Sequence, residues 1–331
     1  MTSPVSSSLE ETRQRIAHNL ALAHELVTIL KAFETRAIRS VPLRGLVLAE
    51  QLYGDSTARP CGDLDLLVRK SELAQVKTTL YKLGYRLCDR RPGFAQAFSY
   101  TWEFFKVQPI PIIIEPHWNL AYPPYTEQLD MEAVWQRCVP GHCCGIATLL
   151  LSPEDQLLNL CLHLVHHNSG APLLWVSELD QFIRKYQATL DWPQLVSTAQ
   201  QGGVGGLVAA ALQRARTVCD TPLPDGMLEQ LAARQTVRPS LASAVIDSVN
   251  VPGKESLAAW FAVKGWRAKW RYAVGLLFPS PEFMRLHYGL STTWQLWLWY
   301  PRRFLRLCLE AARGFSHLLI RRMHDAQRMS R

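Results

Sequence analysis

Apolar residues near the start of the chain recur at intervals of three and four positions, the spacing of one helix face. The residues that follow this spacing are Ile16, Leu20, Ala23, Leu26, Val27 and Leu30. Ser7 and Ser8 stand three residues before Glu10 and Glu11, which is the pattern of a capping box. The pattern therefore predicts a helix over about residues 9–35, and an N-terminal helical segment over 1–36.

Between residues 37 and 150 the pattern changes between helical spacing and short apolar runs. Helices are expected over 46–53 and 71–84, and strands over 64–68, 85–88, 97–107 and 110–115. The run Ile112–Ile114 is β-branched, a residue type that favours strands. This mixture predicts an α/β or α+β domain over 37–150.

After residue 150 the strand pattern stops. Ser152 followed by Pro153 is typical of a helix start, with Ser as N-cap and Pro in the first turn. Further helical patterns cover about 153–168, 173–189, 191–201, 203–219 and 226–235. We expect a helical domain over 151–237 and a basic, Trp-rich helical C-terminal region over 238–331. The first part of this C-terminal region, about residues 238–255, has a looser pattern.

The composition excludes a disordered chain, because 48% of the 331 residues are apolar and only 19% are charged. The net charge of +8 is unevenly distributed: residues 254–331 hold 14 basic and 4 acidic residues, whereas the preceding 253 carry a net −2. Six of the eleven Trp also lie in this C-terminal segment. The positive charge therefore describes one region, where three interpretations stay open: core or partner packing, an anionic membrane surface, or nucleic acid.

The eight cysteines include no C-x-x-C pair, so no zinc or redox motif is indicated. The N-terminus lacks the basic and apolar regions of a secretory signal, and no run of about 18 apolar residues exists. We therefore expect a cytoplasmic protein with reduced thiols, located either in solution or peripherally at a membrane.

Two carboxylates, Asp63 and Asp65, stand two positions apart at the start of the predicted strand 64–68. Residues i and i+2 of a strand share a face, roughly 7 Å apart, and such a pair is costly to bury without a cation. Mg²⁺ favours these oxygen ligands. Glu115 ends the Ile-rich strand, and if the two strands are neighbours the three acids could hold two Mg²⁺ ions. The competing interpretation is a turn and a solvated strand end.

The surrounding residues resemble a known family. The segments that carry the likeness are Arg44-Gly45, Leu52-Tyr53-Gly54, Arg59, Gly62 to Val68, Leu83-Gly84-Tyr85, Glu115-Pro116-His117-Trp118 and Leu174-Trp175 with Glu178. Together they are similar to the uncharacterised nucleotidyltransferases of bacteria, within the DNA polymerase β-like superfamily. The resemblance extends over about residues 40–220 and implies an α+β fold, with a nucleotidyltransferase-type mixed sheet followed by an all-α C-terminal part.

The resemblance also implies roles for residues. Asp63 and Asp65 would bind Mg²⁺, and Glu115 would be a metal ligand or a base toward the acceptor hydroxyl. Gly45 would start a helix whose free backbone N–H groups approach a triphosphate, with Gly62 nearby in the nucleotide site. By their positions, Arg44 and Arg59 are expected to contact phosphate, the alternative for Arg59 being a surface residue that pairs with Asp55 or Asp63. His117 shares the strand face of Glu115 and could orient a phosphate or the acceptor. Arg44 stands where this family usually has Lys, and Glu115 stands where Asp is more common.

His163 and His166 share a face of the helix that follows Ser152. They could be a metal pair or a contact to acceptor or nucleotide, but the simpler interpretation is packing at a domain junction.

The sequence thus predicts an Mg²⁺-dependent enzyme that moves a nucleoside monophosphate from an NTP to a hydroxyl and releases pyrophosphate. The acceptor, a small molecule, a peptide or RNA, would bind between the α/β part and the helical part. The alternative is a non-catalytic scaffold of the same fold, which would dock a protein partner or a membrane through residues 254–331.

Overall fold

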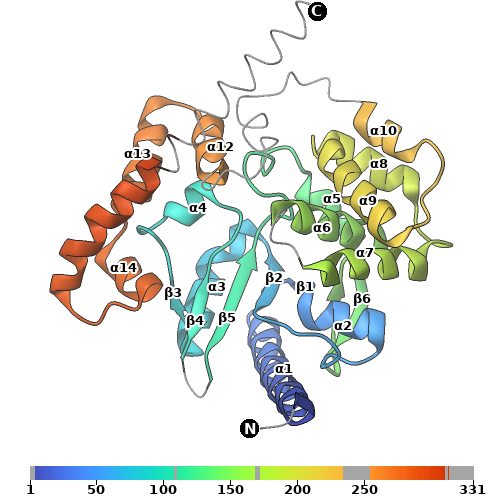
Figure 1. Cartoon of the computed structure of the whole chain (residues 1–331), viewed down its shortest axis with the longest axis horizontal. Helices are drawn as coiled ribbons and strands as arrows, with labels where there is room; N and C mark the ends of the chain where they lie inside the picture. The colour runs from blue at the N-terminus through green and yellow to red at the C-terminus, as the bar shows by residue number, and fades with distance from the viewer. Residues whose placement is uncertain (1–3, 108–109, 168–171, 234–253, 310–311, 313–331) are drawn as a thin grey trace, which may run out of the picture. The chain divides into compact units, whose positions relative to one another are not determined.

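The computed structural model describes residues 4–107, 110–167, 172–233, 254–309 and 312 (Figure 1). The chain divides into two compact units, each continuous in space but not in sequence. The first comprises residues 1–87, 101–121 and 128–234, and the second comprises 88–100, 122–127 and 235–331. The acidic residues singled out above all belong to the first unit.

A mixed five-stranded sheet forms the centre of the first unit, in the order β1-β2-β5-β4-β3. Its strands are β1 (Ser40–Leu43), β2 (Leu64–Val68), β3 (Arg86–Leu87), β4 (Phe104–Lys106) and β5 (Ile112–His117). β2 and β5 are parallel, and the other neighbours are antiparallel. All five residues of β2 are buried, which agrees with its almost wholly apolar sequence. The expected α+β class with a mixed sheet is confirmed.

The helices within residues 4–82 of the first unit are α1 (Pro4–Glu34), α2 (Gly45–Tyr53), the short 3₁₀ helix η1 (Lys70–Glu72) and α3 (Leu73–Lys82). Apolar side chains of α1, α2 and α3 are buried, whereas η1 has no buried residue. In α3 the buried positions Leu73, Val76 and Leu80 recur at helical spacing. In α1 the fully buried residues include Leu22, Ile29 and Phe33.

The helical section predicted after residue 150 is present and belongs to the same unit as the sheet. It consists of α6 (Pro153–His166), α7 (Leu173–Tyr186), α8 (Trp192–Gln201), α9 (Gly205–Cys219) and α10 (Met227–Ala233). Ser152 caps α6 as expected: its hydroxyl accepts the backbone N–H of Asp155, and Pro153 occupies the first turn.

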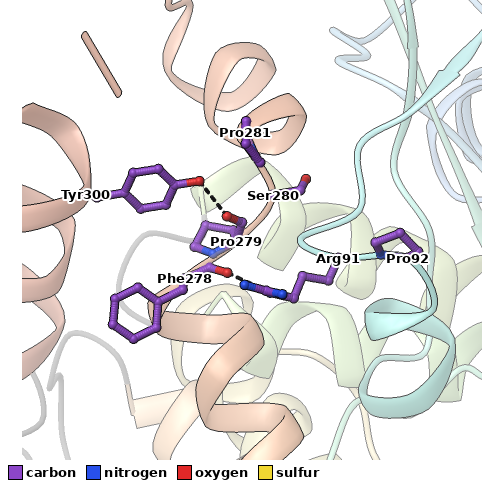
Figure 2. Close-up of a pocket in the computed structure, with 7 residues that line it drawn as sticks. All are labelled: Arg91, Pro92, Phe278, Pro279, Ser280, Pro281 and Tyr300. Atoms are coloured by element: carbon purple, nitrogen blue, oxygen red, sulfur yellow. Dashed lines mark hydrogen bonds between the residues drawn. The ribbon is translucent and has the colours of Figure 1, made fainter. Parts of the chain in front are cut away.

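The second unit is helical in the described residues. Its helices are α4 (Phe94–Phe98), α12 (Lys254–Ala262), α13 (Trp266–Leu277), α14 (Pro281–Tyr288) and a helix over 293–309. The segment between α13 and α14 is held from two sides: Arg91 Nε donates to the carbonyl of Phe278 and the Tyr300 hydroxyl donates to that of Pro279, both at 2.7 Å (Figure 2). No helix in the described ranges is long and apolar enough to cross a bilayer.

Three predictions about elements were wrong. α1 begins at Pro4, so Ser7 and Ser8 lie within the helix rather than at its cap. The strand expected over 97–107 is reduced to residues 104–106, since residues 94–98 are helical and Phe94 stacks on Tyr272 of α13 at 5.5 Å.

The third error is an omission. The segment after α5 (Met131–Arg137) forms a hairpin of β6 (Val139–Cys143) and β7 (Ile146–Leu150), joined at Cys144 and Gly145, both with positive φ. Of the looser stretch predicted over 238–255, residues 238–253 lie outside the described residues.

Candidate active site

The pairing of β2 with β5 brings two of the three predicted acids together. The parallel register places Asp65 opposite Glu115, although 50 positions separate them in the sequence. Asp65 is 9% exposed and the Glu115 side chain 27%. His117, two residues beyond Glu115 on β5, is buried against both, since its Nε2 lies 2.8 Å from Asp65 Oδ1 and 3.6 Å from Glu115 Oε2.

These three side chains could hold a metal ion, because one ligand atom from each lies within 4.8 Å of the others. Among the described residues this is the one group of three or more His, Cys, Asp or Glu side chains that meets this condition. The condition set by the sequence analysis, that the strands of Asp65 and Glu115 are neighbours, is met by the pairing of β2 with β5.

Asp63 occupies the bend directly before β2, close enough for its charge to affect the pKa of Glu115. Burial, reinforced by the charge of Asp65, raises the pKa of Asp63 from 3.8 to about 6. Burial and the charges of Asp65 and Asp63 raise the pKa of Glu115 from 4.5 to about 8. Asp63 and Glu115 thus retain protons at higher pH than ordinary carboxyls, because burial disfavours their charged forms and the neighbouring carboxylates repel them.

Asp65 differs because a cation contacts it directly. Burial alone would raise the pKa of Asp65, but Arg44 and the hydrogen bond from His117 hold this pKa well below its usual range. Burial lowers the pKa of His117, so the imidazole is neutral near pH 7 and its Nε2–H donates to the Asp65 carboxylate.

Arg44 lies between β1 and α2 in a strained conformation, with φ 41° and ψ −140° at the N-cap of α2. Its Nη2 is 2.8 Å from Asp65 Oδ2, and its Nη1 donates to Asn159 Oδ1 on α6 at 2.9 Å. The guanidinium thus bridges the sheet and the helical section. Gly45, which follows with φ +42°, is the first residue of α2.

Arg59 is buried rather than on the surface. Its Nε lies 2.8 Å from Glu178 Oε1 on α7, and its Nη1 makes a long contact of 3.5 Å with the carbonyl of Gly45. The interpretation of Arg59 as a surface residue that pairs with Asp55 or Asp63 is therefore wrong. Gly62 is exposed, and no atom lies within 4 Å of where a side chain would begin.

Asn159 is a residue of this site that sequence reasoning missed. It is 1% exposed, and its side-chain NH₂ has no hydrogen-bond partner among the described residues, although its oxygen accepts from Arg44. No local motif marks it, because it lies within an ordinary amphipathic helix and 115 residues from its partner.

His163, one turn beyond Asn159 on α6, packs its ring against Trp175 at 4.3 Å and against His167 at 4.8 Å. Burial and the charge of Arg44 hold the pKa of His163 far below its usual range. His163 and His166 form no three-ligand group with other described residues.

The residues of this site all lie within a segment that matches a known protein family. Residues 2–220, two thirds of the chain, match the family described as uncharacterised nucleotidyltransferase. This chain belongs to that family. The match covers the whole sheet, the acid group and α6 to α9, so the family resemblance inferred from the motifs is confirmed.

The solution structure of the antibiotic-resistance factor ANT(2'')-Ia is similar to 60% of this chain and 96% of that chain, at 16% identity and a TM-score of 0.39. At that score the likeness carries no weight for the site or the activity. No curated protein matches the sequence.

Proposed function

We propose that this nucleotidyltransferase-family protein is an active, Mg²⁺-dependent enzyme that transfers a nucleoside monophosphate from an NTP to a hydroxyl group. The acceptor oxygen would form a bond to the α-phosphorus as the bond to the β-phosphate oxygen breaks, so that pyrophosphate leaves. The observation that carries the proposal is the placement of Asp65 opposite Glu115 on parallel strands, with Asp63 directly before β2.

The acids fit a divalent cation. Asp63, Asp65 and Glu115 offer hard oxygen ligands, and the pKa values of Asp63 and Glu115 are raised by burial and by the neighbouring carboxylates, both of which a bound cation would offset. These three residues would hold Mg²⁺, which would supply electrostatic stabilisation of the reacting phosphates. Because nitrogen is a poor ligand for Mg²⁺, we assign His117 to orient Asp65 through its 2.8 Å hydrogen bond.

Glu115 is the proposed base. In the metal-free protein, a pKa raised to about 8 keeps Glu115 mostly protonated at neutral pH, so it becomes a base only when bound Mg²⁺ lowers this pKa. It would take the proton of the acceptor hydroxyl as the oxygen attacks. With Mg²⁺ bound, Glu115 would be ionised, and a Glu115 oxygen that contacts the acceptor rather than the ion could serve as this base.

Positive charge and backbone N–H groups would bind the triphosphate. Arg44 supplies a guanidinium next to the acids, and the N-terminus of α2 at Gly45 favours anions. Gly62 leaves open space beside Asp63, and Arg59 makes a long contact to the Gly45 carbonyl at the start of α2. We place the acceptor, which is a small molecule, a peptide or RNA, on the side of the site where Asn159 and His163 lie. We expect the reaction to take place in the cytoplasm, where the eight free cysteines would stay reduced.

The test measures pyrophosphate release and label transfer from each α-labelled NTP to a metabolite and RNA extract, with and without Mg²⁺. Asp65→Asn should abolish both signals. Asp155→Asn is the matched control: Asp155 is also buried, at 1% exposed, and is paired with Arg137 at 2.8 Å, but it lies outside the acid group. Equal activity in wild type and Asp65→Asn would overturn the assignment, and inactivity of the wild type with every NTP would favour the scaffold alternative.

A further inference from the structure

The helix over 293–309 is attached to the second unit by one face only. The hydroxyl of Tyr300 donates to Pro279, and Arg303, 5% exposed, donates through Nε and Nη2 to the carbonyl of Leu276. Trp299 packs against Tyr288 at 4.7 Å, and Leu296 is buried in the same apolar cluster. These contacts, at intervals of three and four residues, fix both the position and the rotation of the helix (Figure 2 shows the Tyr300 contact).

The opposite face of this helix is apolar and exposed. Trp297 is 79% exposed, Leu298 63%, Trp294 62% and Leu305 61%. At 100° per residue, positions 294, 298 and 305 fall within about 40° of one another around the axis. A stripe of this kind on a fixed helix is larger than the scattered apolar residues of an ordinary surface.

Positive charge borders this stripe without entering it. Arg302 and Arg306 are exposed on one flank, and residues 291–309 contain no Asp or Glu. The 22 residues that follow in the sequence add five Arg against one Glu and one Asp. The region is therefore complementary to a surface that is apolar inside and negatively charged at its boundary.

We propose that this stripe docks the protein on the surface of an anionic lipid bilayer. Exposed Trp and Leu on one face, with Arg on the polar flank, are the features of a helix that lies in the plane of a membrane interface. Single-stranded nucleic acid fits less well, since its binding surfaces mix aromatic and basic residues, whereas Leu298 and Leu305 have no ring on which a base could stack.

The experiment uses the full chain and sedimentation with two kinds of vesicle, pure phosphatidylcholine and phosphatidylcholine with one third phosphatidylglycerol. Anionic vesicles should retain the protein at least about tenfold better than neutral ones, because each Arg near an anionic surface strengthens binding about fivefold. Raising the salt from 0.1 to 1 M should reduce this preference.

Paired substitutions locate the surface. Leu298→Glu together with Leu305→Glu should lower retention on anionic vesicles by about tenfold or more, since the leucines lose their apolar contact and the new charges repel the lipid. Leu173→Glu is the control, because Leu173 is 70% exposed on α7 in the first unit. Unchanged melting temperatures show that the variants fold.

Failure of the wild type to bind anionic vesicles would overturn the proposal, as would equal retention of the double variant. Salt-sensitive retention of single-stranded RNA that the double variant loses, with no vesicle binding, would replace it by a nucleic-acid surface. None of these outcomes depends on nucleotidyl transfer.

Discussion

Asp65 is the residue on which most interactions of the site meet. One carboxylate oxygen accepts from His117, the other faces Arg44, and Arg44 in turn contacts Asn159. A buried carboxylate with this many charged or polar partners is held in one orientation. For Asp63 and Glu115 the effect is the opposite, because burial and the charge of Asp65 raise their pKa values.

The raised pKa of Glu115 makes the stability of the metal-free protein depend on pH. Between its ordinary value of 4.5 and about 8, the folded state binds more protons at this group than the unfolded state, so stability falls as pH rises. Asp63 acts in the same direction up to about pH 6. Urea unfolding in EDTA should show a smaller loss of stability from pH 5 to 8 in Glu115→Gln than in wild type.

Glu229→Gln is the control for that measurement, because Glu229 is exposed on α10, outside the acid group. If the stability of Glu115→Gln depends on pH as that of the wild type and of Glu229→Gln does, the pKa of Glu115 is not raised in the folded protein.

At the scale of elements, the start of α2 requires two successive residues with positive φ, Arg44 at 41° and Gly45 at 42°. Gly45→Ala should lower the free energy of unfolding by about 1–2 kcal/mol, since an L-residue is strained there. The cost is conformational, because the nearest atom to an added Cβ, the Asp63 carbonyl oxygen, is 3.8 Å away.

Gly62→Ala tests this reason in the adjoining segment. Gly62 does not have positive φ and has open space around it, so its replacement should change the free energy of urea unfolding little. Equal losses from both substitutions would show that the geometry at Gly45 is not the cause.

Elements with an uninterrupted local signal could be predicted from the sequence. The strand 64–68 has the predicted bounds because a run of apolar residues after a turn is typical of a buried strand. The β6–β7 hairpin escaped prediction because Pro140 and Gly141 interrupt the strand pattern. Residues 94–98 form a helix because Phe94 packs against Tyr272, a contact that lies far off in the sequence.

The same limit applies to the site. The spacing of Asp63 and Asp65, with the family resemblance, indicated that the acids would lie near Glu115, and the strand register agrees. The partners of Arg44 and Arg59 could not be predicted, because Asn159 and Glu178 lie on helices more than a hundred residues away. Such contacts depend on how helices pack on the sheet, which no local pattern encodes.

At the scale of the first unit, the pair Arg59–Glu178 connects the segment before β2 to α7. Arg59 is 8% and Glu178 2% exposed. Glu178→Gln should cost about 3–5 kcal/mol of unfolding free energy, because it leaves a buried guanidinium without its counter-charge. Replacing both partners by Met and Leu should cost far less.

Asp180→Asn on the same helix is the control, since its partner Arg184 is 46% exposed and such a pair contributes about 1 kcal/mol or less. Urea unfolding of the four proteins decides: a Glu178→Gln loss no larger than that of Asp180→Asn would contradict the buried-pair account.

The most direct test of the central claim, that the acid group binds a metal-bound nucleotide, is the melting temperature with millimolar NTP in the presence and absence of Mg²⁺. A ligand at 100 times its Kd should stabilise the wild type by about 2.7 kcal/mol. We predict a rise that requires Mg²⁺ and NTP together, disappears in Asp65→Asn and persists in Asp155→Asn. No rise with any of the four NTPs, or an equal rise in Asp65→Asn, would contradict the claim.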